Sequence, residues 1–192
     1  MKKMLVVIAL AVVSFANAQK GTVLVGGSVG YSSHNVSNRG NDSKESVFNF
    51  SPRVGYQFND NWTVGGEFTV ATAKEEFGNN ENKINNFALG AFLRYTLPLN
   101  QTFSVFADLG AGFQNQKDEV YNGFVTTTAK ADGMYVGITP AIFINVKKGF
   151  GLNFNIGGLG YSALSYEHNG PDVNDFSFSF GKAFNIGISK NF

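Results

Sequence analysis

FNFSPRVGYQFNDNWTVGGEF, residues 48–68, places an aromatic or aliphatic residue at almost every second position. The alternation stops at the polar break Asn59–Asn61 and resumes at Trp62. A period of two is typical of β-strands, and a short run of Asn and Asp is typical of the turn between them. The stretch therefore predicts a hairpin with one aromatic face and one face of small and polar residues.

The same alternation recurs along the rest of the chain and predicts eight strands and no helix. The seventh strand becomes ambiguous at Gly157-Gly158, where a bulge is expected to shift the register. The other expected strands are TVLVGGSVGYSS (22–33), the two strands of the quoted hairpin, FALGAFLRYTL (87–97), FSVFADLGAGF (103–113), MYVGITPAIFINV (134–146) and FSFSFGKAFNIGISKNF (176–192).

The connections alternate between short and long. The three short ones, 59–61, 98–102 and 147–149, are odd in length, and Asn61 and Gly149 stand where a three-residue hairpin needs a left-handed residue. Short turns at one end and long loops at the other are typical of an all-β, eight-stranded antiparallel up-and-down transmembrane β-barrel. The four long polar connections are Ser33–Ser46, Ala73–Asn86, Gln114–Ala131 and Leu164–Asp175, and they are expected outside the cell.

Four charged residues fall on the small, polar face of the strands: Arg53, Glu67, Arg94 and Asp108. Pairing of Phe58 with Trp62 places Arg53 directly opposite Glu67, so a charge swap at these two positions is expected to keep the pair. Pairing of Leu97 with Phe103 makes Asp108 a diagonal neighbour of Arg94. We expect these four residues to form a charge network with a structural role inside the barrel, because a crowded interior needs small residues and paired charges.

The aromatic face is then expected to point outward into lipid. It carries Lys182 and Lys190, both near strand ends where a long side chain can reach the interface. The alternative is a soluble, lipocalin-like barrel with its apolar face inside, which binds a hydrophobic ligand. That arrangement would leave the small, polar face in water and crowd the aromatic side chains into the interior.

The N-terminus has the pattern of a bacterial secretory signal peptide. Two lysines precede the apolar run Met4–Val13, and Ala16-Asn17-Ala18 supplies the small residues of a cleavage site. We therefore expect residues 1–18 to be a signal peptide and residues 19–192 to be a single outer-membrane β-barrel domain. The chain contains no cysteine, which excludes disulfides and thiolate metal sites.

These features resemble the small eight-stranded outer-membrane β-barrels of the outer membrane protein A and X type, and especially the Bacteroidetes outer membrane protein beta-barrel domain, or porin family, of Gram-negative bacteria. The resemblance is carried by SPRVGYQFNDNWTVGGEF, FLRYTLPL, FSVFADLGAGF and the terminal GISKNF. In this family the last strand is the signal read by the outer-membrane assembly machinery. The resemblance implies that role for Phe184, Ile186, Ile188 and Phe192, whereas Lys190 departs from the family pattern.

Three classes of function stay open. The first is a non-enzymatic integral barrel of the cell outer membrane with a structural or surface-interaction role, acting through its four loops on an extracellular ligand. The second is a narrow, passive, porin-like channel, and the third is a lipid A-modifying enzyme that uses His34 or His168 at the rim. No cofactor, metal or nucleic acid is expected; the expected partners are membrane lipids, lipopolysaccharide and the assembly machinery, with the barrel a monomer.

Overall fold

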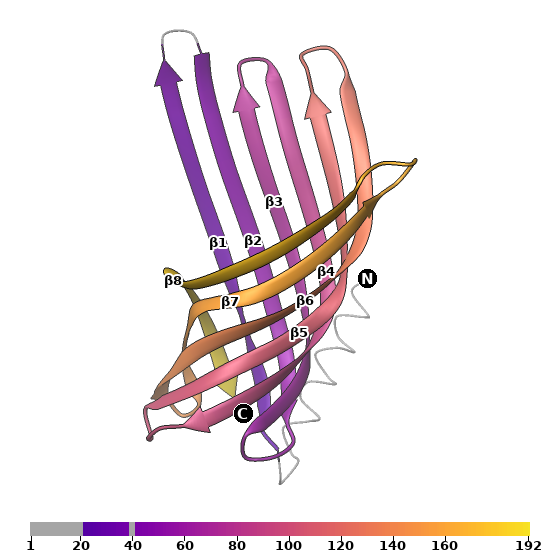
Figure 1. Ribbon diagram of the computed structural model, residues 1–192. Coiled ribbons are helices and arrows are strands. Elements are labelled where there is room, and N and C mark those ends of the chain that lie inside the picture. The colour runs from indigo at the N-terminus through magenta and orange to yellow at the C-terminus, as the bar shows by residue number, and fades with distance from the viewer. Residues whose placement is uncertain (1–20, 39–40) are drawn as a thin grey trace, which may run out of the picture.

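The computed structural model describes residues 21–38 and 41–192, apart from the side chains of residues 38, 41 and 182–185. Eight antiparallel strands, each paired with its neighbours in the chain, form a closed barrel (Figure 1). Within the described residues, no helix has both the length and the apolar character that a membrane span requires. The strands are β1 (Val23–Asn38), β2 (Asn41–Gln57), β3 (Trp62–Phe77), β4 (Asn80–Pro98), β5 (Phe103–Tyr121), β6 (Thr126–Lys147), β7 (Phe150–Tyr166) and β8 (Asp172–Asn191).

The two faces of the sheet lie as the alternation predicted. Outward side chains such as Tyr31 and Phe113 are 72% and 71% exposed, whereas the inward Arg94 and Asp108 are each 6% exposed. The polar face of the alternation is therefore inside and its aromatic face outside. This arrangement confirms the predicted barrel and contradicts the lipocalin-like alternative, in which the apolar face would be buried.

Two of the short turns depart from the predicted three-residue conformation. In the first, Phe58 pairs with Trp62 as expected, but Asn61 has a negative φ, and the Asn59 side chain holds the turn by accepting a hydrogen bond from Asn61 N at 2.9 Å. The β6–β7 turn has two residues instead of three: Lys148 and Gly149 both have positive φ, at 47° and 76°. A bulge beside Lys147 offsets the missing residue and keeps the faces of both strands aligned.

The register of β4 and β5 differs from the expected one. Leu97 pairs with Val105 instead of Phe103, so Arg94 lies directly opposite Asp108. The cause is in the turn, where the Asn100 side chain accepts hydrogen bonds from Thr102 N and Phe103 N at 2.9 and 2.8 Å. This side-chain-to-backbone motif fixes a four-residue connection that strand periodicity does not reveal.

The four segments expected to be long loops are mostly strand. We call these segments, 33–46, 73–86, 114–131 and 164–175, the hairpin ends; in them the paired strands continue almost to the tips. The connections that remain are Gly78–Asn79, Asn122–Val125 and Glu167–Pro171, while residues 39–40 lie outside the described part. Strand pairing satisfies the hydrogen bonds of the backbone whatever the side chains are. In these segments polar residues stand on both faces, so no alternation of apolar and polar residues identified them as strands in the sequence.

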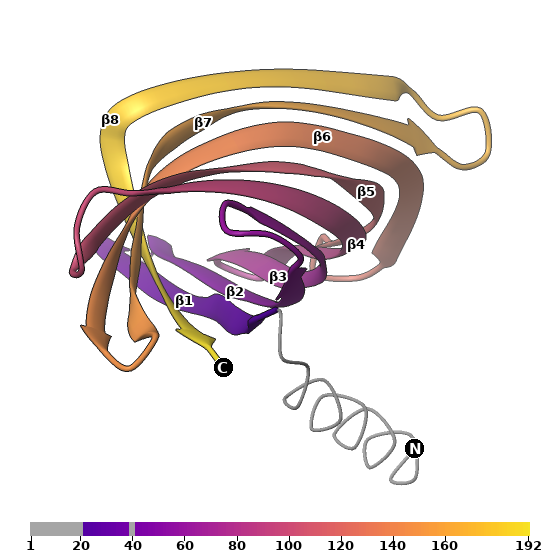
Figure 2. The same ribbon diagram turned by 90° about the horizontal axis from the view of Figure 1, so that it is seen from below.

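The contact between β1 and β8 is the shortest in the barrel. It comprises four residue pairs, from Leu24–Asn191 to Gly27–Ile188, and no further β1–β8 pair occurs among the described residues. A register shift beside Gly157, where a bulge was expected, and a positive φ of 71° at Gly181 accompany the bend of β8. Figures 1 and 2 show the β7–β8 hairpin leaning away from the other three hairpins.

Candidate functional site

The four predicted interior charges meet in the lumen, and we call Arg53, Glu67, Arg94 and Asp108 the lumen cluster. Arg53 of β2 lies opposite Glu67 of β3, with 3.1 Å between Nη2 and Oε2. Across the lumen, Arg53 Nη1 is 2.5 Å from Asp108 Oδ2. Arg94 binds the same carboxylate with both Nε and Nη2, at 2.6 and 2.8 Å. Asp108 therefore joins the two arginines, and the cluster has no net charge.

Two inward aromatic rings support the arginines. The guanidinium carbon of Arg94 is 3.7 Å from the ring centroid of Phe106, and that of Arg53 is 5.3 Å from the centroid of Phe92. Phe92 is only 2% exposed. A guanidinium over an aromatic face is stabilised by the ring quadrupole, most strongly where water is excluded. Sequence reasoning missed both rings, although each interrupts a row of small residues on the inward side of its strand.

Glycine makes room for these large groups. A Cβ at Gly65 would lie 2.3 Å from Val54 O and 2.7 Å from the Phe92 ring. A Cβ at Gly90 would lie 2.2 Å from the hydroxyl of Tyr135, a further inward aromatic residue that the sequence analysis did not identify. The small residues of the inward face are therefore a packing requirement of the large ones.

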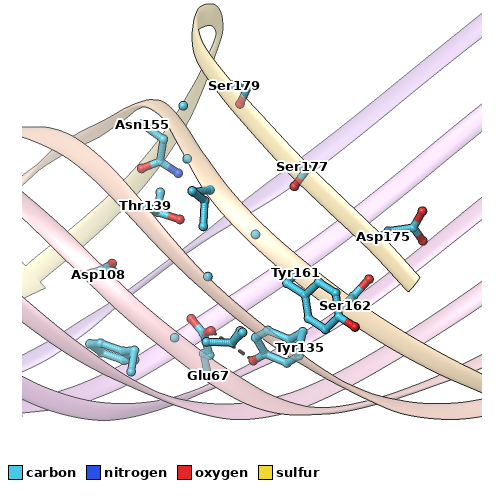
Figure 3. Close-up of a pocket in the computed structure, with 18 of the residues that line it drawn as sticks. Glu67, Asp108, Tyr135, Thr139, Asn155, Tyr161, Ser162, Asp175, Ser177 and Ser179 are labelled. Atoms are coloured by element: carbon cyan, nitrogen blue, oxygen red, sulfur yellow. Dashed lines mark hydrogen bonds between the residues drawn. The ribbon is translucent and has the colours of Figure 1, made fainter. Parts of the chain in front are cut away.

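A cavity of about 430 Å³ lies beside the lumen cluster, and we call it the lumen cavity. Figure 3 shows Ser177 and Ser179 of β8 on one side of it and Glu67 and Tyr135 on the other. The Tyr135 hydroxyl donates a hydrogen bond to Glu67 Oε1 at 3.2 Å. Hydroxyl and amide groups line most of the remaining polar wall, so the cavity suits water or a small polar solute.

Two much smaller hollows, of about 40 and 50 Å³, lie between the lumen cavity and the end of the barrel that carries the three short turns, which we call the turn end. Arg53 lines both the lumen cavity and the first small hollow, and Arg94 and Phe106 line both small hollows. The arginines and their aromatic support therefore lie between the lumen cavity and the two small hollows.

The hairpin ends carry a second set of polar contacts. The Tyr166 hydroxyl donates to Asp118 Oδ2 at 2.6 Å, and this hydrogen bond is the main reason that the pKa of Tyr166 is raised. Lys74 contacts Glu76 and Glu81, and the hydrogen bond to Glu76 is the main cause of the raised pKa of Lys74. These partly buried contacts link β7 to β5 and β3 to β4 in the hairpin ends.

The two histidines lie in different hairpin ends. His34 on β1 faces Glu45 of β2 in the register, and His168 is in the β7–β8 connection with a positive φ of 58°. His168 Nδ1 is 3.9 Å from a carboxylate oxygen of Glu167, its neighbour in the chain. Over residues 21–38 and 41–192, no three His, Asp or Glu side chains gather as a set of metal ligands.

Comparison with known protein families identifies the family to which this barrel belongs. The outer membrane protein beta-barrel domain matches residues 4–184. The chain belongs to this family. The protein is accordingly located in the outer membrane, and the outward aromatic face of this outer-membrane barrel lies against lipid. No curated protein matches the chain.

Solved outer-membrane barrels are similar in fold. OprG from Pseudomonas aeruginosa has 15% sequence identity and a TM-score of 0.53, over 90% of this chain and 96% of that one. Ail of Yersinia pestis, solved with the heparin analogue sucrose octasulfate, has 16% identity and a TM-score of 0.48, over 90% and 97% of the two chains. Neisserial surface protein A has 14% identity and a TM-score of 0.44, with the same coverage. At these identities the likeness concerns the fold alone.

The residues expected to guide assembly of the outer-membrane barrel lie on its outer surface where they are described. Ile186, Ile188 and Phe192 are 57%, 54% and 59% exposed, while the side chain of Phe184 lies outside the described part. Phe192 also exchanges two backbone hydrogen bonds with Val23, at 3.0 and 3.3 Å. The C-terminal residue thus takes part in closing the barrel.

Proposed function

We propose that the protein is a non-enzymatic barrel of the outer membrane with a structural and surface-interaction role, carried out by its hairpin ends. The observation that carries this proposal is the lumen cluster, whose side chains reach across the interior of the barrel from β2 to β5. Arg53 and Arg94 are held in place by Asp108 and by aromatic rings. An eight-stranded barrel has an interior just wide enough for side chains, so such a cluster leaves little room for solute flow.

The hairpin ends support the surface role. Continued strand pairing presents them as projections instead of mobile loops, and the β5–β6 tip exposes Phe124 at 93% and Val125 at 61%. These two apolar side chains are open to contact with a partner. We propose that these ends face the cell exterior and that the short turns face the periplasm, and that an extracellular ligand meets the tips.

The alternative is a narrow, passive channel. The lumen cavity of about 430 Å³ favours it, because a small polar solute would fit. Conduction would require the paired arginines to move apart from Asp108, which costs several kcal/mol for a buried pair. A lipid-modifying enzyme has weaker support, since Glu45 faces His34 in the register without a hydrogen bond between their side chains among the described contacts.

Several further expectations belong to this proposal. Residues 1–18 act as a signal peptide, and 19–192 form the barrel domain. Phe184, Ile186, Ile188 and Phe192 are read by the assembly machinery, and the barrel works as a monomer in a membrane that contains lipopolysaccharide. The bacterium is of the Bacteroidetes type.

Conductance across a planar bilayer tests the proposal. Folded wild-type protein should give no steady conductance steps, whereas a wide porin inserted under the same conditions should give them. The double variant Glu67→Ala/Asp108→Ala, which removes both carboxylates of the lumen cluster, should conduct more than wild type. Reproducible steps from the wild-type protein would support the channel instead.

A further inference from the structure

An apolar groove lies on the outer surface of the barrel where β1 meets β8. Its volume is about 400 Å³, and its walls come from β1, β2, β8 and the start of β7. The side chains that form the walls are Val25, Val29, Phe50, Pro52, Phe150 and Ile188. In an outer-membrane protein this surface faces hydrocarbon, so lipid chains are the molecules that reach it.

The groove is built by the backbone. Gly27 occupies the outward position between Val25 and Val29, where the alternation otherwise places a side chain. A Cβ at Gly27 would lie 2.5 Å from Ser51 O and 2.8 Å from the Cα of Pro52. Because the backbones of β1 and β2 approach so closely here, no larger residue fits at position 27, and Gly27 lines the groove with backbone alone.

A positively charged side chain, that of Lys190, lies at the turn end of this groove. Lys190 pairs with Val25 on one side and with Phe150 on the other, and its side chain is exposed. Its Nζ is 4.5 Å from the ring centroid of Phe192. Among the described side chains, Lys190 has no carboxylate within ion-pair distance. A lysine beside hydrocarbon extends its ammonium toward the headgroup region, where an anion would balance it.

We propose that this groove binds one anionic phospholipid from the leaflet at the turn end. An acyl chain lies over Gly27 between Val29 and Ile188, and the headgroup phosphate meets the ammonium of Lys190. A free phosphate would make no use of the apolar walls. A zwitterionic lipid carries its own cation next to the phosphate, and this cation weakens the attraction between the phosphate and the Lys190 ammonium. The groove thus selects a lipid that has both an acyl chain and a net negative charge.

Native mass spectrometry of the folded barrel in detergent tests this proposal. Phosphatidylglycerol and phosphatidylcholine with identical acyl chains are titrated separately, and folding is checked for every variant by gel mobility without heating. Wild type should bind phosphatidylglycerol about fivefold more tightly, as one favourable lysine near a lipid surface implies. Lys190→Gln should abolish this preference, and Lys190→Arg should keep it.

Two further variants separate the parts of the site. Lys130→Gln makes the same charge change in a hairpin end and should leave the preference unchanged. Val29→Ser should weaken the binding of both lipids equally, because it alters the wall and not the charge. Equal binding of the two lipids by wild type, or a preference that survives in Lys190→Gln, would overturn the proposal. Unchanged lipid binding in Val29→Ser would overturn the placement of the chain in the groove.

Discussion

Asp108 binds both arginines of the lumen cluster, so the effect of exchanging the charges of Arg53 and Glu67 depends on Asp108 as well. If only the pairing of Arg53 with Glu67 mattered, the double variant Arg53→Glu/Glu67→Arg would keep the attraction between the two side chains. However, Arg53 Nη1 is 2.5 Å from Asp108, so a glutamate at position 53 would meet that carboxylate. The swap should remain destabilised by about 3–5 kcal/mol, as expected for a buried charge that has lost its partner.

Urea unfolding in lipid vesicles, followed by the fluorescence of Trp62, measures this effect. Glu67→Ala provides the comparison, because it leaves Arg53 bound to Asp108 and should cost less than the swap. Recovery of wild-type stability in the swap would show that Asp108 does not engage Arg53.

Neighbouring glycines on β3 give a matched test of interior packing. Gly65→Ala places a methyl group 2.3 Å from Val54 O and 2.7 Å from the Phe92 ring, so it should destabilise the barrel by about 1–3 kcal/mol. Gly66 points outward, and its added methyl group would meet nothing closer than 3.7 Å. Gly66→Ala should therefore be neutral or slightly stabilising. Equal effects of the two substitutions on the urea midpoint would contradict the tight fit around Phe92.

At the scale of elements, continued pairing in the hairpin ends predicts where proteases cut. Chymotrypsin added to intact cells should cleave after Phe124, which is 93% exposed in the unpaired connection Asn122–Val125. Trypsin should cut slowly at Lys117 and Lys130, because both lie in paired strands. Phe124→Ser should remove the main chymotrypsin product and serves as the control. Trypsin cleavage at the Lys147–Lys148 turn in sealed cells would show that the orientation is reversed.

At the scale of the whole molecule, the closed barrel predicts resistance to detergent unfolding. Every strand is hydrogen-bonded to two neighbours, and the β1–β8 contact is the shortest at four pairs. Unheated and boiled samples should therefore migrate differently on a denaturing gel. Identical mobility of the two samples would be inconsistent with a closed barrel.

The sequence by itself determined the strands, the direction in which their faces point and the pairing of Arg53 with Glu67. These features follow from counting along the chain: side chains alternate across a strand, and the first turn sets the register of its two strands. The N-terminal pattern likewise gave a prediction about processing, but residues 1–20 lie outside the described part.

Only the tertiary structure decided how Asp108 joins Arg53 to Arg94, how the hairpin ends stay paired and where the groove beside Gly27 lies. The contact from β2 to β5 crosses the lumen, and its geometry depends on the stagger and diameter of the barrel. The β4–β5 register depends on the Asn100 turn, and the β1–β8 contact joins the two ends of the chain. Alternation is a local property, so it cannot specify contacts between strands that closure of the sheet brings together.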